Sequence, residues 1–293
     1  MSKLLEILQS GKVLLGDGAM GTQLHQRGLE TGSCPELWNV THPEVVGQII
    51  RGYLDVGSDL VETNSFGGTR FKLRHYDLVD RTSELNEAAG RIARQAAGSS
   101  HWVAGSVGPT GEFLQPLGSV SEADIYEAFR EQIVALAAGG VDAICIETMT
   151  ALDEASVALR AAKDHTDLPV IVTFTFDKTA QGAYRNMMGI SPAQAAEEMT
   201  RAGADIVGSN CGNGPEDLLA ITLEIRAHTD RYLMIQPNAG VPELHDGRTV
   251  FRATPDEMAA CIKPLVEMGV NIIGGCCGTI PDHIAAMRQA LDG

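Results

Sequence analysis

Residues 55–63 read DVGSDLVET, and the same pattern returns as AGGVDAICIET at 138–148 and RAGADIVGS at 201–209. Each segment places a glycine where a helical stretch ends, then an aspartate, then a short apolar run. Glycine readily takes the left-handed conformation that closes a helix, and continuous apolar strands are typical of a parallel sheet covered by helices. The pattern therefore predicts a helix leading into a buried parallel strand, repeated along the chain.

Strands of this kind recur through the whole sequence, separated by helical spacing such as that at Ile125–Ala138, Ser191–Ala202 and Pro255–Met268. The eight strands that we predict are Val13–Gly16, Asp59–Thr63, Trp102–Ser106, Ala143–Glu147, Val170–Phe176, Ile206–Ser209, Tyr232–Gln236 and Asn271–Gly274. Eight strand–helix units indicate a single-domain α/β fold over residues 1–293, a (β/α)₈ barrel of the TIM type. The alternative is an open doubly wound sheet, which usually carries G-x-G-x-x-G after its first strand, and GDGAMGT at 16–22 lacks that spacing.

The composition excludes several classes of protein. With 44% hydrophobic and 20% charged residues the chain is too apolar for a disordered protein, and a net charge of −16 argues against a nucleic-acid or anionic-membrane surface. No apolar run is long enough to cross a membrane, and Glu6 interrupts the N-terminal apolar stretch, which predicts an amphipathic helix rather than a signal peptide. We therefore expect a cytoplasmic protein whose six cysteines remain thiols.

The predicted strands end in segments rich in glycine and polar side chains. They read GDGAMGT, ETNSFGGT, GSVGPTG, ETM, TFTF, GSNCGNG, QPNAG and GGCCGT in chain order. In (β/α)₈ barrels the carboxyl-terminal strand ends carry the chemistry. A barrel with only structural demands has no need of aspartate, glutamate, asparagine and three cysteines at one rim, so we predict a functional site there.

Three cysteines are the sharpest of these signals. Cys211 ends the sixth predicted strand and the pair Cys276–Cys277 ends the eighth, close enough around a barrel to share one centre. Neighbouring residues on a regular strand point to opposite faces, but the flanking glycines can bend the chain and turn both sulfurs inward. Three thiolates bind Zn²⁺ and leave one coordination position open, as in catalytic zinc sites, whereas a strained vicinal disulfide leaves Cys211 unexplained. The remaining cysteines are expected to be two buried apolar residues and an ordinary free thiol: Cys145, Cys261 and Cys34.

These motifs resemble those of the homocysteine S-methyltransferases, a family of zinc-dependent barrel enzymes, and are most similar to the homocysteine-binding module of cobalamin-dependent methionine synthase. The resemblance runs from about Val13 to Asp292, and GDGAMGT, ETNSFGGT, GSVGPTG, IETM, NCGNGPE, PNAG and GGCCGT occur in the order of the family. It implies an enzyme that binds homocysteine to zinc and methylates it to methionine. A free thiol with a pKa of about 8.5 is mostly protonated at neutral pH, and zinc converts it to the attacking thiolate.

The resemblance also implies roles for individual residues. The three cysteines are expected to be the zinc ligands. Asp17 and Glu147 are expected to face the substrate ammonium, and Asn238 to orient the substrate or occupy the open position on zinc. The structural alternative for Asp17 and Asn238 is that they cap turns. Further contacts with the substrate are expected from the backbone amides of Gly18, Ala19 and Met20 and from Thr63, Asn64, Ser65 and Ser106.

The methyl donor differs among members of the family. Betaine enzymes carry a tyrosine directly after the glutamate, where this chain has Thr148, and the motifs GDGAMGTQL, NSFGGTR and GSVGPTGE are more similar to those of the cobalamin-dependent synthases. The corrinoid-ligating signature D-x-H-x-x-G is absent up to Gly293. We therefore expect methylcobalamin or another methyl-corrinoid on a partner protein as the donor. The alternatives are S-methylmethionine or S-adenosylmethionine as direct donor, an excised module of a larger synthase, and a non-catalytic zinc-bound thiol-binding module.

Overall fold

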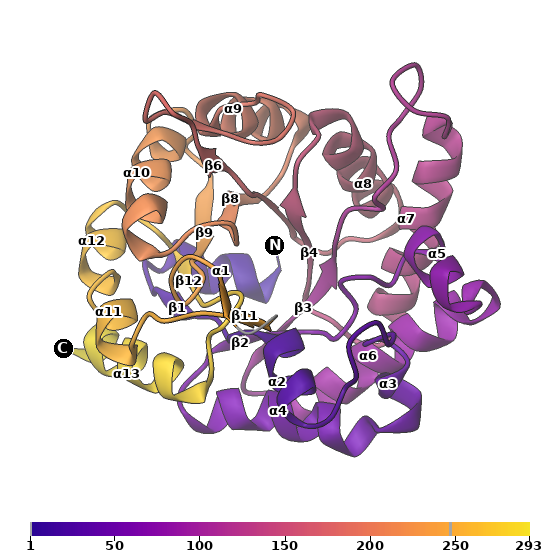
Figure 1. Cartoon of the computed structure of the whole chain (residues 1–293), viewed down its shortest axis with the longest axis horizontal. Helices are drawn as coiled ribbons and strands as arrows, with labels where there is room; N and C mark the ends of the chain where they lie inside the picture. Colours follow the sequence, from indigo (N-terminus) through magenta and orange to yellow (C-terminus); the bar gives the residue numbers. More distant parts are fainter. Residues whose placement is uncertain (1, 246–247) are drawn as a thin grey trace.

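The computed structural model describes residues 2–245 and 248–293, in which eight parallel strands form a ring surrounded by helices (Figure 1). The strand order is β1-β12-β9-β8-β5-β4-β3-β2. A hydrogen bond of 2.7 Å from Asp59 N–H to Leu15 O joins the two ends of this order and closes the ring. The predicted single-domain (β/α)₈ barrel is confirmed.

The barrel strands agree with the predicted ranges to within two residues at either end. They are β1 Leu14–Leu15, β2 Leu60–Glu62, β3 Trp102–Val107, β4 Ala143–Met149, β5 Val170–Phe174, β8 Ile206–Asn210, β9 Tyr232–Gln236 and β12 Ile272–Ile273. Two antiparallel hairpins lie outside the barrel, β6 Asp177–Lys178 with β7 Tyr184–Arg185 and β10 Glu243–His245 with β11 Arg248–Val250.

The helices follow the strands as predicted, with one difference. They are α1 Lys3–Gln9, α2 Met20–Gln26, α3 Trp38–Thr41, α4 Pro43–Asp55, α5 Arg70–Leu73, α6 Thr82–Ala97, α7 Glu122–Ala138, α8 Leu152–His165, α9 Pro192–Ala202, α10 Pro215–Arg226, α11 Pro255–Ala259, α12 Ile262–Glu267 and α13 Pro281–Asp292, with short 3₁₀ turns at Arg74–Tyr76 and Val79–Arg81. The single helix predicted at Pro255–Met268 is divided into α11 and α12, because Pro264 lacks the N–H that would bond to Ala260 O and its ring clashes with that carbonyl. None of the described helices is long and apolar enough to cross a membrane.

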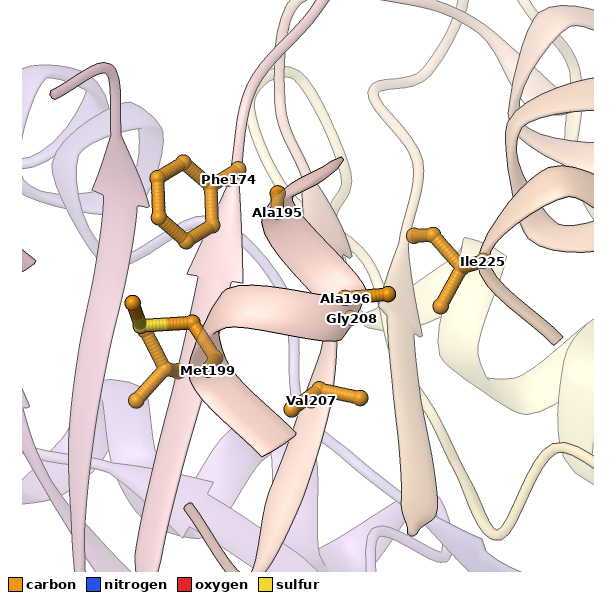
Figure 2. Close-up of a pocket in the computed structure, with 8 residues that line it drawn as sticks. Phe174, Ala195, Ala196, Met199, Val207, Gly208 and Ile225 are labelled. Carbon is orange, nitrogen blue, oxygen red and sulfur yellow. The ribbon is translucent and has the colours of Figure 1, made fainter. Parts of the chain in front are cut away.

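Apolar side chains fill the layer between the strands and the outer helices. Figure 2 shows part of this layer, where Ala195 and Met199 of α9 pack against Phe174 of β5 and Val207 of β8. The space left between these side chains is too small for a water molecule. Such close packing fixes each helix against its strands and thereby fixes the strand ends that carry the polar motifs.

The predicted N-terminal amphipathic helix is α1, which closes the amino-terminal end of the barrel. Its apolar residues Leu4 and Leu8 are fully buried and pack in one cluster with barrel-interior residues such as Leu60, Ile171 and Ile272. In Figure 1, α1 lies within the ring of strands and farther from the viewer than the β10–β11 hairpin. One end of the barrel is thus sealed by apolar contacts, and only the opposite end presents the polar strand ends.

The three repeated helix–strand junctions have a shared physical explanation. In each, a left-handed glycine ends the helix, and the following Asp59, Asp142 or Asp205 accepts a hydrogen bond from a backbone N–H of the neighbouring strand. Each aspartate also forms an ion pair. The N–H donors are those of Leu15, Val103 and Val170 at 2.9, 2.8 and 2.8 Å, and the basic partners are Arg288, Arg94 and Lys163. The repeated aspartate therefore ties neighbouring strands together at the amino-terminal end.

Candidate functional site

Three sulfur atoms meet at the carboxyl-terminal mouth of the barrel. The Sγ atoms of Cys211, Cys276 and Cys277 all lie within 4.8 Å of one another, and those of Cys211 and Cys277 are 3.6 Å apart. Among the described residues, no other group of three or more histidine, cysteine, aspartate or glutamate side chains brings its ligand atoms this close. The structure thus brings together the one cysteine and the vicinal pair that the sequence analysis singled out.

The backbone leaves regular strand geometry at each of these cysteines. Cys211 follows β8 with φ of 63°, a left-handed conformation that is uncommon for a residue with a side chain. The pair Cys276–Cys277 lies in a turn beyond β12, tied to the end of β9 by hydrogen bonds to Pro237 O (2.8 Å) and from Ala239 N–H (2.9 Å). At Gly278, with φ of 80°, a Cβ atom would lie 2.3 Å from Phe251. These departures turn all three sulfurs toward one point.

The three thiols share their protons unequally. Hydrogen bonds from Cys276 and Cys277 lower the pKa of Cys211 to about 3. The contact with Cys211, together with burial, raises the pKa of Cys277 to about 12 and that of Cys276 well above its usual value. The cluster therefore favours ionisation at Cys211, and a bound divalent cation would displace the remaining thiol protons. Such a soft sulfur donor set fits Zn²⁺.

Asn210, the last residue of β8, links the sulfur cluster to its surroundings. Its fully buried side chain accepts hydrogen bonds from Thr148 N–H (2.9 Å) and Thr173 Oγ1 (2.7 Å). Its amide nitrogen donates to Glu147 Oε2 (3.1 Å) and lies 3.7 Å from Cys276 Sγ. Asn210 is not among the residues predicted from sequence, although an asparagine directly before a cysteine at the end of a buried strand is a usable signal.

Glu147 is aimed into the barrel by an irregularity in β4. The register between β4 and β5 shifts between Ile146 and Met149, and Thr148 has φ of 59°. Bulges of this kind often redirect a side chain beside a functional site. Glu147 is 6% exposed, accepts a hydrogen bond from the Ser106 hydroxyl, and has a pKa raised well above its usual value by burial. The predicted residues Glu147 and Ser106 are therefore in direct contact.

Two further carboxyl groups lie near Glu147. Asp17 is 2% exposed, and its Oδ2 accepts the N–H of Glu62 at 3.0 Å. Burial, with a smaller contribution from the charge of Glu147, raises the pKa of Asp17 to about 8. Burial and the charge of Asp17 raise the pKa of Glu62 to about 8 as well. We call Asp17, Glu62 and Glu147 the carboxyl cluster; its member Glu62 was missed by the sequence analysis, although it begins the quoted motif ETNSFGGT.

The segment that follows β1 packs against the turn that carries Cys276 and Cys277. A Cβ atom at Gly18 would lie 2.6 Å from Thr279 Oγ1 and 2.9 Å from Tyr53, so glycine is required here. The Tyr53 hydroxyl donates to Ala19 O and Thr279 O at 3.2 and 3.1 Å, which joins the two segments. Ala19 N–H donates to Thr279 Oγ1 at 3.0 Å. Of the three amides predicted to meet a substrate carboxylate, those of Gly18 and Met20 are therefore the better candidates.

The polar residues after β2 have hydrogen-bond partners within the protein. Thr63 Oγ1 accepts the N–H of Ser106 at 2.9 Å, and the hydroxyl of Ser65 donates to Ser106 O at 2.7 Å. The side chain of Asn64 donates to Asn39 Oδ1 at 3.0 Å. These groups hold the ends of β2 and β3 together. A direct contact of Thr63, Asn64 or Ser65 with a substrate stays a prediction.

Asn238 lies beside the sulfur cluster, as its place between the two cysteine-bearing strands predicted. It is 2% exposed, and its side chain forms a hydrogen bond that helps to lower the pKa of Cys211. Its Oδ1 has no hydrogen-bond partner among the described residues.

Cys145 and Cys261 are buried, as expected. Cys34, expected to be an ordinary free thiol, is also buried, and burial raises its pKa to about 12, so it is a poor nucleophile.

The family comparison agrees with the motifs. Residues 14–291 match the family described as homocysteine S-methyltransferase. The chain belongs to the homocysteine S-methyltransferase family. This confirms the family predicted from the strand-end motifs, an enzyme family named for methyl transfer to a thiol.

Relatives of known name or structure cover nearly the whole chain. The methionine synthases of Mycobacterium leprae and Mycobacterium tuberculosis are 34% and 35% identical to it over 98% of its length. The chain spans about a quarter of the length of these two relatives, since 25% of each is covered. The metallated form of the Escherichia coli homocysteine methyltransferase MmuM superposes with a TM-score of 0.80 at 23% identity, covering 98% of this chain and 99% of MmuM. That likeness supports the same fold.

Proposed function

We propose that this protein binds homocysteine through its sulfur at a zinc ion held by Cys211, Cys276 and Cys277, and that it methylates this sulfur to give methionine. The observation that carries the proposal is the meeting of three sulfurs within 4.8 Å beside a cluster of buried carboxyl groups. The sulfurs suit a soft metal, and the carboxyl groups suit the cationic end of an amino acid. Reduced thiols are consistent with action in the cytoplasm.

The residues around the sulfurs would prepare the nucleophile. Bound zinc would lower the pKa of the substrate thiol and supply it as a thiolate. Asn210 holds both Glu147 and Cys276 in place, and Asn238 contacts Cys211, so these two amides fix the sulfur donors. Such outer contacts orient metal ligands and keep their geometry open for a substrate atom.

The other end of homocysteine would meet the remaining polar groups of the mouth. Asp17 and Glu147 face its ammonium in the proposal, since both carboxyl groups are buried and their raised pKa values indicate that they lack a compensating charge. The amides of Gly18 and Met20, at the start of α2, would receive its carboxylate. Holding both ends of the amino acid leaves the sulfur as the group free to react with the methyl donor.

A methyl-corrinoid carried on a protein is the donor that we favour. The similarity to methionine synthases over 98% of the chain supports it, as does Thr148 in the place where betaine enzymes have tyrosine. The loops around the mouth also expose apolar side chains, as expected of a surface that meets another protein. These side chains are Phe66, Phe113, Leu117, Met187, Met188, Val241 and Leu244.

The test offers homocysteine and four donors in parallel to the zinc-loaded protein: methylcobalamin, S-methylmethionine, S-adenosylmethionine and betaine. A methylated corrinoid domain from a methionine synthase serves as a fifth donor. We expect methionine from the two corrinoid donors and faster turnover with the protein-borne one. Methionine formed only from the sulfonium compounds would replace the corrinoid assignment by the direct-donor alternative. No methionine from any donor, with homocysteine bound, would support the non-catalytic thiol-binding alternative.

A further inference from the structure

A histidine outside the sulfur cluster is hydrogen-bonded through both of its ring nitrogens. His283 lies in the first turn of α13 and is 7% exposed. Its Nδ1 accepts the N–H of Ile280 at 3.1 Å, and its Nε2 lies 2.9 Å from Ala253 O. A carbonyl oxygen can only accept a hydrogen bond, so Nε2 carries the proton and Nδ1 does not. The two backbone partners therefore require one neutral tautomer of the ring.

These two hydrogen bonds complete a closed path of contacts around the turn at Cys277. Ala239 N–H donates to Cys277 O at 2.9 Å, and Ala253 N–H donates to Ala239 O at 2.9 Å. Ala253 O then accepts from His283, whose Nδ1 holds the N–H of Ile280. The path thus begins at one cysteine of the sulfur cluster and returns to the chain just beyond it.

Two further contacts connect this path to the sulfur cluster. Ala239 directly follows Asn238, whose side chain bonds to Cys211. Phe251, at the end of the β10–β11 hairpin, packs against Gly278, where a Cβ atom would lie 2.3 Å from its ring. A shift of the segment that contains Phe251 and Ala253 would therefore be passed to the backbone on both sides of the cysteine turn.

The simpler role for His283 is that of a helix cap. A side chain at the third position of a helix commonly accepts the N–H of the residue before the helix, and Gln194 in α9 and Glu257 in α11 do so at 2.9 and 2.7 Å. The bond from Ile280 to His283 belongs to that role. The bond to Ala253, which lies 30 residues away in the chain, has no part in capping α13.

We propose that His283 is a positioning residue of the zinc site, which fixes the turn carrying Cys276 and Cys277 through its hydrogen bond to Ala253 O. Neighbouring cysteines can present both sulfurs to one centre only where the backbone leaves regular strand geometry, so contacts from outside the turn must hold it. The inference rests on the proposed function in taking the three sulfurs as zinc ligands. It deepens that proposal by assigning the geometry of two ligands to a side chain of α13.

Three variants separate positioning from capping. His283→Leu removes both hydrogen bonds, His283→Glu keeps an acceptor for Ile280 N–H but loses the donor to Ala253 O, and His283→Gln offers an acceptor and a donor. Competition with a fluorescent chelator measures zinc affinity, and the absorption bands of the Co²⁺-loaded protein report the geometry of its sulfur ligands. We expect His283→Leu and His283→Glu to bind zinc about tenfold more weakly than wild type and to have altered Co²⁺ bands, with His283→Gln closer to wild type in both.

Gln194→Ala is the matched control. Gln194 also accepts the N–H of the residue before its helix, Ser191, but it is exposed and lies in α9. Its loss should leave zinc affinity unchanged. Wild-type zinc affinity and Co²⁺ bands in His283→Glu would show that His283 only caps α13, which would overturn the inference and leave the proposed function standing.

The comparison of His283→Glu with His283→Gln keeps the test decisive if His283→Leu fails to fold. Equal zinc affinity in these two variants would overturn the inference, because only the glutamine can donate to Ala253 O. Failure of the wild-type protein to bind zinc would overturn the proposed function and the inference with it.

Discussion

Acidic side chains at the two ends of the barrel have different partners. At the amino-terminal end, Asp59, Asp142 and Asp205 each accept a backbone N–H and pair with a basic side chain. At the carboxyl-terminal end, Asp17 is buried and Glu62 is half-buried, both have raised pKa values, and neither pairs with a basic side chain among the described residues. The paired acids tie neighbouring strands together, whereas the acids without a basic partner lie at the proposed substrate site. In the proposed function, the same residue types therefore serve stability at one end and binding at the other.

The two ends of the barrel also differ in which residues adopt the left-handed backbone conformation. The left-handed residues at the junctions of the amino-terminal end are glycines, which adopt that conformation without strain. At the other end, Thr148 and Cys211 have φ of 59° and 63° although each carries a side chain. Strained backbone of this kind persists where the surrounding structure enforces it and is concentrated at functional sites. Here the strain positions the neighbours Glu147 and Asn210 as well as the sulfur itself.

Removing one sulfur should have the largest effect on the carboxyl-terminal end. In Cys211→Ala, we expect loss of stoichiometric zinc and a fall in methyl transfer to below roughly one-hundredth of wild type. Changes in the outer contacts of a metal commonly cost about 10- to 100-fold, and the loss of one of three ligands should cost more. Metal analysis after gel filtration and a methionine-formation assay measure the two effects.

Cys261→Ala is the control for this change. Cys261 is buried against α11, with its Sγ 2.9 Å from Met258 O, and lies outside the sulfur cluster. It should retain wild-type zinc content and activity. Full activity of Cys211→Ala in a preparation shown to be free of metal would contradict the proposed role of the sulfurs.

An intermediate effect is expected from Asn210→Ala. The side chain of Asn210 contacts Glu147, Thr148 and Cys276 but would not itself be a metal ligand. Zinc affinity and activity should therefore each fall by about 10- to 100-fold, the usual range for outer contacts of a metal. Competition with a fluorescent zinc chelator measures the affinity, and circular dichroism checks that the barrel is intact. Unchanged zinc affinity in a folded variant would show that Asn210 does not position the cluster.

Much of the barrel and the three cysteines of the site can be predicted from sequence, because both depend on local pattern. The junction segments and strand ends recur with short, regular spacing, and Cys211 and the vicinal pair stand out by residue type. Asn210, Glu62 and Gln236 stand in the quoted strand-end motifs, but the contacts that they make could not be recognised in this way. Their importance arises from contacts between distant strands, such as the Glu62–Gln236 hydrogen bond, which depend on barrel register rather than on neighbouring residues.

The smallest expected effect concerns stability, and it should have opposite signs at the two ends. Burial raises the pKa of Asp59, but hydrogen bonds and charge from Leu15, Arg288 and Lys12 outweigh it and lower that pKa overall. Its ionised form therefore stabilises the fold, and this contribution is lost as pH falls below about 4. Asp59→Asn should be less stable than wild type by about 1 kcal/mol at pH 7, with the difference vanishing in acid.

Glu62 should behave in the reverse sense in metal-free protein. Its pKa is raised from 4.5 to about 8 by burial and by Asp17, so the folded state binds the extra proton between these values. Wild type should then lose stability as pH rises through that window, and Glu62→Gln, which cannot ionise, should gain relative to it. Urea unfolding of both variants at a series of pH values measures the two difference curves. If the two stability differences changed with pH in the same direction, the different roles proposed for the acids at the two ends would be contradicted. The acids at both ends would then be compensated within the protein.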